Sequence, residues 1–204
     1  MKHLLSILFL ATCVLSANVF GAEPDTIRAA KSYKNGGHYS VGGSGTPEEI
    51  KFKNERILPA GTNGTYCSGF TFSVVMRAAE QRGLLKDKSV DEIRKFQKEW
   101  YGVTGDTNKQ AGPAMDNLGI GKSISAEQAQ PGDFVQLWRS KSGHSAVFLG
   151  WVEEAGKKIG FRYRSSQKST DGISDNVEYF SDVPGKKGAV VRERTYFARL
   201  NPKS

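Results

Sequence analysis

The sequence has 204 residues and is basic, with 29 lysines and arginines against 21 aspartates and glutamates and a formal net charge of +8. The basic residues are scattered and form only short pairs such as Lys157-Lys158 and Lys186-Lys187. Nucleic-acid binders typically carry a basic stripe with interleaved aromatic residues. This composition therefore argues against a nucleic-acid partner, and the positive charge suits an anionic polymer such as a bacterial envelope.

The N-terminus has the pattern of a signal peptide. A charged start is followed by a mostly apolar run over residues 4–15 and then by small residues up to Gly21 and Ala22. The run is shorter than the ~20 residues that cross a bilayer, and no later stretch is apolar enough to span. We expect cleavage after Gly21 or Ala22, removal of residues 1–22, and a protein that is periplasmic or secreted. Lipidation of Cys13 is the alternative, although the threonine before it fits poorly.

Residues 23–64 are predicted to form an N-terminal extension of short helices and loops. A short helix is expected over Asp25–Tyr33, followed by a glycine- and serine-rich loop over Asn35–Gly45. Thr46-Pro47-Glu48-Glu49 then places an N-cap residue, a proline at the first helical position and a glutamate at the third. This capping pattern predicts a second short helix, ended by residues 59–64.

Residues 65–204 are predicted to form the main domain, and its first half is helical. The segment Cys67–Arg82 has a broad apolar face and is followed by Gly83, the residue type that helices favour just after their C-terminus. A second capping box at Ser89 opens a helix that ends near Gly102. A weaker helix is expected over Lys109–Leu118.

Strands follow these helices. The apolar period changes to two over Asp133–Arg139, and a turn at Lys141–Gly143 leads to a partner strand over His144–Val152. Further strands are expected at Ile159–Ser166 and Thr195–Leu200. Helices first and an antiparallel sheet afterwards indicate an α+β domain.

Cys67 is the only cysteine that remains once the signal is removed. Such a thiol is a buried filler, an intermolecular bridge or a reactive group. Its predicted place at the start of a helix favours the reactive role, because unpaired amide groups and the helix dipole stabilise a thiolate there. The same backbone N–H groups could form an oxyanion site.

A cysteine nucleophile needs a base, and beyond the signal the chain has two histidines, His38 in a glycine-rich loop and His144 at the predicted hairpin. His144 is the better-placed base. Strand alternation puts it on one face with Ala146, which leaves room for a helix end, and with Phe148, while Trp151 faces the other way. We expect His38 to be an ordinary loop residue.

The third catalytic position should orient the imidazole of His144. On the next strand Tyr163, Ser165 and Gln167 share one face. Gln167 has the reach and a carbonyl acceptor, so it is the first choice, with Ser165 second.

The sequence resembles a known family at these positions. Tyr66-Cys67-Ser68-Gly69-Phe70 resembles the aspartate-cysteine-serine-glycine signature of NlpC-type cell-wall peptidases, with Tyr66 in place of the aspartate. The stretches 131–135 and 143–150 are similar to the proline-glycine-aspartate and glycine-histidine strands of that CHAP-related superfamily. The resemblance implies a papain-like fold, in which N-terminal helices pack on a central antiparallel sheet. It also implies cleavage of amide bonds in peptidoglycan stem peptides.

We therefore expect a monomeric, exported cysteine peptidase or amidase that acts on peptidoglycan or a similar anionic polymer. In this interpretation Cys67 forms a thioester acyl-enzyme and His144 serves as base, after first holding an ion pair with it. No cofactor is expected, and two histidines and one cysteine lack the spacing of a metal site. The alternatives are a non-catalytic envelope-binding module on the same scaffold, an acyltransferase, and an antibacterial amidase toxin.

Overall fold

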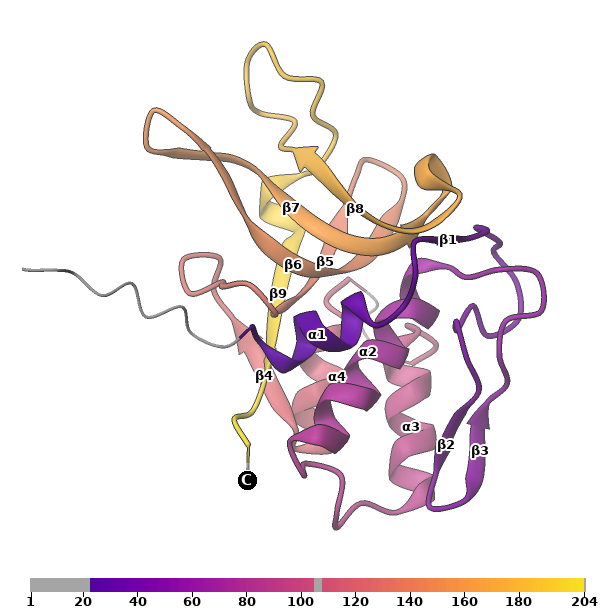
Figure 1. The fold of residues 1–204 in the computed structure, drawn as a ribbon. Coiled ribbons are helices and arrows are strands. Elements are labelled where there is room, and N and C mark those ends of the chain that lie inside the picture. Colours follow the sequence, from indigo (N-terminus) through magenta and orange to yellow (C-terminus); the bar gives the residue numbers. More distant parts are fainter. Residues whose placement is uncertain (1–22, 105–107, 204) are drawn as a thin grey trace, which may run out of the picture.

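The computed structural model describes residues 23–104 and 108–203, which form one antiparallel sheet, a separate hairpin and a layer of helices (Figure 1). The sheet has seven strands in the spatial order β1 (Gly36–Gly37), β8 (Gly172–Tyr179), β7 (Lys157–Gln167), β6 (Gly143–Glu154), β5 (Phe134–Trp138), β9 (Thr195–Leu200) and β4 (Gly121–Ile124). The four helices are α1 (Asp25–Lys31), α2 (Cys67–Gln81), α3 (Val90–Trp100) and α4 (Ala111–Leu118). The expected α+β class with an antiparallel sheet is confirmed.

The predicted signal peptide, residues 1–22, lies outside the described residues. Within the described ranges, no helix has the length and apolar character needed to cross a membrane. Two short 3-10 helices, η1 (Lys168–Thr170) and η2 (Arg192–Arg194), precede β8 and β9 respectively.

The helices gather on one face of the sheet, with α2 at their centre (Figure 1). Phe70, Phe72 and Val75 of α2 are fully buried in a core that also contains Trp100 of α3 and Phe134 of β5. Each such side chain contributes roughly 1.5–3 kcal/mol through the apolar surface that it removes from water. This core fixes α2 against the middle of the sheet, which positions its N-terminal residue.

Two of the predicted helices have the expected ends. Ser89 accepts a hydrogen bond from the backbone N–H of Glu92, and the Glu92 carboxylate accepts one from the backbone N–H of Ser89, so the predicted capping box is present. Gly83 follows α2 with φ +75°, a conformation that costs glycine little.

A second core lies on the face of the sheet opposite to the helices. It contains Phe148, Phe161 and Phe197. The strand alternation expected beyond Phe148 is wrong, because a register shift between Phe148 and Gly150 reverses the side-chain order. Trp151 therefore packs in this core, with its ring centroid 5.0 Å from that of Phe148.

The helix predicted after Thr46 is wrong, because this segment forms a hairpin of β2 (Ile50–Phe52) and β3 (Glu55–Leu58). Lys53 and Asn54 form its two-residue turn with φ of 49° and 66°, the positive values that hairpin turns require. Thr46 donates to the carbonyl of Pro59 at 2.8 Å instead of capping a helix. Ile50 is buried in the helical core and β3 contacts α3, so tertiary packing outweighs the local helix-start signal.

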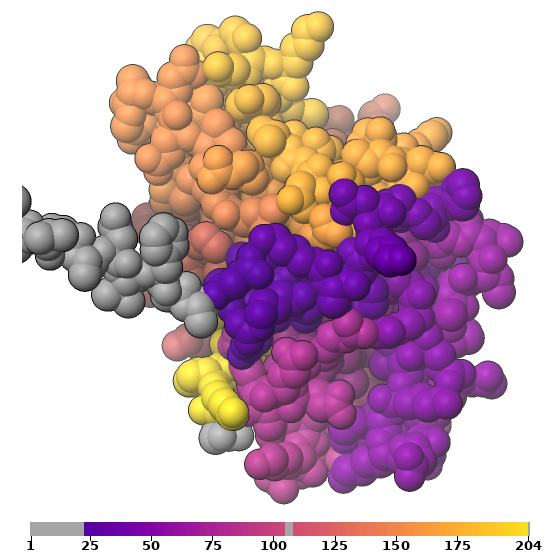
Figure 2. Space-filling model, in the orientation of Figure 1, coloured from indigo at the N-terminus to yellow at the C-terminus, as the bar shows by residue number. Residues whose placement is uncertain are grey.

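The segment 23–64, expected as an extension, is built into the domain. β1, which lies in the predicted loop, pairs with β8, and α1 packs against α2. Figure 2 shows this N-terminal segment, in indigo, at the junction between the helices and the later strands, in orange. β8 was not among the strands expected from the sequence. It begins with two buried residues, alternates half-buried and exposed residues over 174–178, and pairs with β7 along its whole length.

Candidate functional site

Cys67 is the first residue of α2 and is partly exposed. The N-cap residue Tyr66 is extended, with φ −140° and ψ 172°, and its side chain does not cap the helix. The N–H groups of the first turn are therefore free of a side-chain cap beside the thiol. Helix N-terminal N–H groups of this kind favour a nearby anion.

A close backbone contact explains why a glycine stands at position 69, two residues after Cys67. A β-carbon on Gly69 would lie 2.2 Å from the carbonyl carbon of Gly45, so only glycine fits there. A β-carbon on Gly45 would in turn lie 2.0 Å from the ring of Tyr66. Tyr66 donates to the carbonyl of Gly43 at 3.2 Å, and Tyr101 donates to that of Ser44 at 2.7 Å. Tyr66 thus supports the loop that crosses the helix start.

Two hydrogen bonds hold the start of α2 over the sheet, one on each side of Cys67. The Thr71 hydroxyl lies 3.0 Å from the Ser145 hydroxyl on β6. The Thr65 hydroxyl donates to the Ser166 hydroxyl on β7 at 2.8 Å. The chain neighbours of these two serines are His144 and Gln167, so the helix start lies over the strand ends that carry both residues. The side chains of His144 and Gln167 point to the opposite face of the sheet from the two serines, and the His144 ring packs on Tyr163 of the second core.

His144 is buried, with 6% of its surface exposed, and its ring makes an edge contact with Tyr163 at a centroid separation of 5.6 Å. Burial is the main cause that lowers the pKa of His144 from 6.5 to about 3, and the charge of Arg139 lowers it further. Gln167 acts in the opposite direction by favouring the protonated ring. The imidazole is therefore neutral near pH 7.

Gln167 is the residue that lies beside the imidazole. Its influence on the His144 pKa places the two side chains together, although neither amide atom of Gln167 meets full hydrogen-bond geometry. The hydroxyl of Ser165, the second choice, donates to the backbone carbonyl of Ser145 at 2.6 Å. The hydroxyl proton of Ser165 is therefore used in that bond.

Cys67 and His144 are not hydrogen-bonded to each other. The sulfur lies 3.9 Å from the Ser68 hydroxyl, and His144 Nε2 is buried without a partner. Tyr39 interacts electrostatically with Cys67, and Arg139 interacts with His144. Burial first and then the charge of Cys67 raise the pKa of Tyr39, whereas Arg139 lowers it, and Arg139 also acts on His144. Arg139 thus acts on both Tyr39 and His144, and Cys67 acts on Tyr39.

Tyr39 and Arg139 were missed from the sequence. The backbone of Tyr39 forms a parallel bridge with Thr65, a contact between distant loops that no local pattern reveals. Arg139 directly follows β5 and forms an ion pair with Glu178 of β8, a strand that was not expected.

Several buried polar atoms lack a hydrogen-bond partner around the start of β6. They are His144 Nε2, Gln136 Oε1 and both amide atoms of Gln167. Gln136 pairs directly with Ser145 across β5 and β6. Buried polar groups are nearly always hydrogen-bonded, so a group of orphaned atoms calls for an explanation such as catalysis or ligand binding.

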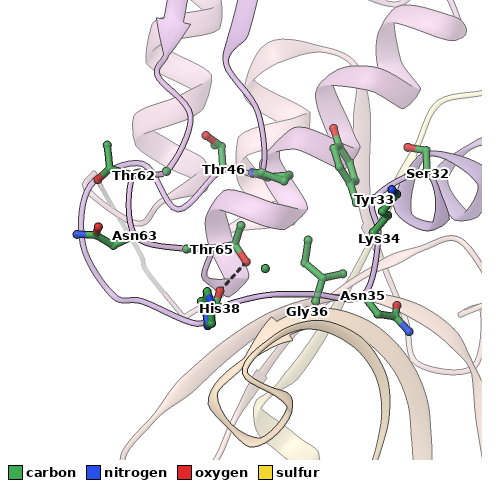
Figure 3. A pocket seen from close by; sticks show the side chains of 15 residues that line it. Ser32, Tyr33, Lys34, Asn35, Gly36, His38, Thr46, Thr62, Asn63 and Thr65 are labelled. Carbon is green, nitrogen blue, oxygen red and sulfur yellow. Dashed lines mark hydrogen bonds between the residues drawn. The ribbon is translucent and has the colours of Figure 1, made fainter.

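A cavity of about 710 Å³ lies next to this site, between the segments 32–38 and 61–65 (Figure 3). Thr65, two residues before Cys67, forms part of its wall. His38, which lies in the expected loop, also lines it. Its Nδ1 lies 2.9 Å from a carboxylate oxygen of Asp171, and the other oxygen accepts from the backbone N–H of Tyr39 at 3.0 Å.

Among the described residues, no group of three or more histidine, cysteine, aspartate or glutamate side chains is placed to hold a metal ion. No known protein family, curated protein or solved structure matches the chain. The chemistry of the site is therefore argued from its geometry.

Proposed function

We propose that the protein is an exported cysteine hydrolase of papain-like NlpC-type fold that cleaves amide bonds in peptidoglycan stem peptides. One observation carries the proposal: a partly exposed thiol at the uncapped start of α2 is tied, through Thr65 and Thr71, to the neighbours of His144 and Gln167. Core packing alone would give no reason for the orphaned polar atoms of His144 and Gln167.

In the first step the Cys67 sulfur attacks the amide carbonyl carbon, and neutral His144 accepts the thiol proton. The lowered pKa of His144 supports a neutral resting imidazole in place of the imidazolium of the ion pair expected from the sequence. The two side chains are not hydrogen-bonded in the substrate-free protein, and catalytic hydrogen bonds are often long or absent in substrate-free enzymes. First-turn N–H groups of α2 stabilise the negative oxygen of the tetrahedral intermediate.

In the second step the imidazolium of His144 gives its proton to the leaving nitrogen, the C–N bond breaks, and a thioester on Cys67 remains. A water molecule then attacks the thioester with His144 as base. The new carboxylate leaves, and the thiol recovers its proton from His144. Gln167 positions the imidazole and favours its charged form during both transfers.

The test is digestion of purified peptidoglycan by residues 23–204, followed by mass analysis of the released fragments. We expect the unchanged protein to release stem-peptide fragments and Cys67→Ala to release none. Ser181→Ala, a change of an exposed serine, is the control and should retain full activity. Circular dichroism should show the same fold for all three. Undiminished release by Cys67→Ala, or none by the unchanged protein, contradicts the proposal.

A non-catalytic envelope-binding module is the second candidate, favoured by the missing hydrogen bond between Cys67 and His144 and by Tyr66 in place of the family's aspartate. Such a module would sediment with peptidoglycan without releasing fragments. Cys67→Ala would then sediment equally well. The digestion experiment therefore separates the two candidates.

A further inference from the structure

The edge strand β1 forms one wall of the cavity beside Thr65. It is the outermost strand of the seven-stranded sheet and pairs with β8 on one side only. Both of its residues, Gly36 and Gly37, line the cavity. Figure 3 shows Gly36 and His38 on a segment that runs between the cavity and the sheet. The unpaired edge of the sheet therefore faces the cavity, and such edges expose main-chain groups that can pair with another chain.

The main-chain N–H of Gly37 is a donor at this edge. A β-carbon on Gly172 of β8 would lie 2.1 Å from the carbonyl oxygen of Gly36 and 2.5 Å from its carbonyl carbon, so this oxygen is directed at β8. The described ranges contain no cis peptide bond, and in a trans peptide the N–H points away from the C=O before it. The Gly37 N–H therefore points away from β8. Within residues 23–104 and 108–203, no hydrogen bond joins it to another segment.

The rest of the cavity wall suits a neutral ligand. In the described lining Lys34 is the one side chain with a full charge, and the ring of His38 is already paired with Asp171. Pro47 and Ile173 add apolar surface. Four hydroxyl groups of the wall are bonded within the protein, namely those of Ser32, Tyr33, Thr46 and Thr65. A ligand would therefore be held mainly by main-chain groups and apolar contacts.

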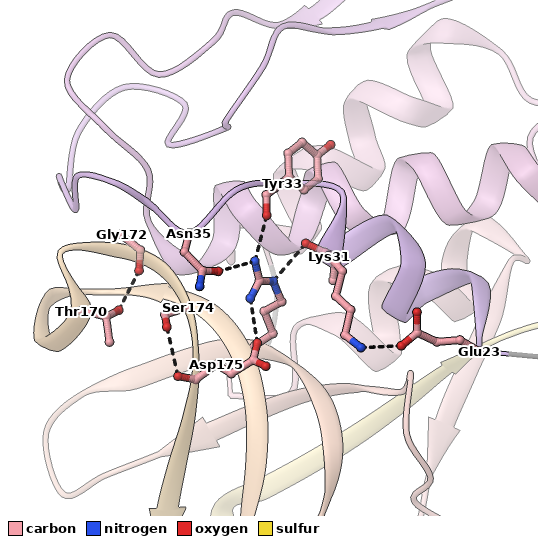
Figure 4. A network of polar contacts seen from close by, with 10 residues as sticks. Glu23, Lys31, Tyr33, Asn35, Thr170, Gly172, Ser174 and Asp175 are labelled. Carbon is pink, nitrogen blue, oxygen red and sulfur yellow. Dashed lines mark hydrogen bonds and ion pairs between the residues drawn. The ribbon is translucent and has the colours of Figure 1, made fainter.

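The segment that leads into β1 is fixed on the sheet. The buried Arg164 of β7 donates to the carbonyls of Ala30 and Tyr33 at 3.1 and 2.8 Å. It also donates to Oδ1 of Asn35 at 2.8 Å and pairs with Asp175 at 2.7 Å (Figure 4). The edge is thus formed before a ligand binds, which lowers the ordering cost of binding.

The edge leads toward the thiol. Just after β1 the protein itself occupies the edge, because Thr65 donates its N–H to the carbonyl of His38 at 2.9 Å and forms a parallel bridge with Tyr39. Thr65 and Cys67 are two residues apart, so at most ~7 Å separates their α-carbons. A peptide beside Gly37 would lie in the same row as Thr65, next to the nucleophile.

We propose that the substrate peptide binds in this cavity as a short extended segment added to the edge of β1, with one of its carbonyls accepting from the Gly37 N–H. A small apolar side chain of the peptide lies against Pro47 and Ile173. Main-chain pairing at an exposed sheet edge is a general mode of peptide recognition. That the ligand is the substrate rests on the proposed function, whereas peptide binding at this edge does not.

The direct test is amide exchange measured by NMR on ¹⁵N-labelled Cys67→Ala, which prevents turnover. The probes are an N-acetylated synthetic stem tetrapeptide and the peptide-free glycan disaccharide of peptidoglycan. We expect saturating tetrapeptide to slow exchange of the Gly37 amide at least tenfold and to leave the exposed Gly185 amide unchanged. No binding of the tetrapeptide, an unchanged Gly37 rate when it is bound, or protection of Gly37 by the disaccharide alone overturns the proposal.

A matched pair of glycine variants locates the peptide at this edge. A β-carbon would meet no atom within 4 Å at Gly37, where φ is +84°, or at Gly185, where φ is +75°. Gly37→Gln and Gly185→Gln, each added to Cys67→Ala, therefore carry comparable backbone strain, but only the first adds a side chain at the cavity. Calorimetry should show at least tenfold weaker tetrapeptide binding for Gly37→Gln and unchanged binding for Gly185→Gln. Equal binding by the two variants overturns the proposal. The exchange measurement needs no change at Gly37, so it decides even if Gly37→Gln does not fold.

The two proposals can fail separately. Protection of the Gly37 amide by the tetrapeptide without any release of peptidoglycan fragments would keep this site and reject the hydrolase. Release of fragments without that protection would keep the hydrolase and reject this site.

Discussion

Replacement of His144 by glutamine should make the stability of the protein less sensitive to acid. The pKa of His144 is lowered from 6.5 to about 3, mainly by burial. Between these two pH values an unfolded chain carries a proton on His144 that the folded chain does not carry. The free energy of unfolding must therefore fall as the pH decreases below about 6.5.

The size of the effect follows from the same numbers. Each pH unit in this window costs about 1.36 kcal/mol, so acidification to pH 4.5 removes about 2.7 kcal/mol through His144 alone. Urea unfolding at pH 7.5 and pH 4.5 measures the loss for wild type and His144→Gln. The wild type should lose about 2.7 kcal/mol more than His144→Gln. Comparison of the two cancels the contribution of carboxylates.

Ser181→Ala, a change of an exposed serine, is the control and should show the acid loss of the wild type. An equal acid loss in wild type and His144→Gln would refute the reasoning. It would mean that folded His144 takes up its proton at an ordinary pH, and the neutral base proposed for the first catalytic step would be wrong.

Three further changes test the fold and the site. Arg164→Met leaves two buried backbone carbonyls without a donor and should lower the free energy of unfolding in urea by about 3–5 kcal/mol. Arg162→Met, a change of an exposed residue on the same strand, should lower it by under about 1 kcal/mol. Equal losses in the two variants would show that the buried network does not stabilise the fold. Ser89→Ala removes the capping box and should cost about 1 kcal/mol, and an unchanged unfolding midpoint would contradict that role. Gln167→Ala should lower kcat for peptidoglycan fragments about tenfold with little change in KM, and it should move the acid limb of the pH profile lower, because Gln167 favours protonated His144. Ser165→Ala should lower stability but keep kcat within about threefold, and a larger kcat loss there than in Gln167→Ala would exchange the two assignments.

Local patterns were sufficient for the elements that carry the proposed nucleophile and base. The apolar spacing after Cys67 predicts α2, the Ser89 motif predicts the start of α3, and the turn before His144 predicts the β5–β6 hairpin. Each depends on residues within one element and its cap. The same kind of local reasoning failed at Thr46, where a helix-start motif precedes a hairpin whose packing against the helical core dominates.

Long-range contacts could not be predicted in this way. The bond from Thr65 to Ser166 joins residues 101 positions apart, and the bond from Arg164 to Asn35 joins residues 129 positions apart. The first places Cys67 over the strand ends, and the second fixes the orientation of the Asn35 amide. The expectation that Ala146 leaves room for a helix end is wrong, because Ala146 packs in the second core and Ser145 is the residue that contacts α2.

The central claim, that the Cys67 thiol cleaves the amide bond, is tested most directly by titration of that thiol. Iodoacetamide is added to the folded protein at pH 7, the fraction of Cys67 alkylated is measured by peptide mapping, and the release of peptidoglycan fragments is followed in the same samples. Activity should fall in proportion to alkylation and reach zero when Cys67 is fully modified. Full alkylation with undiminished release of fragments would contradict the account.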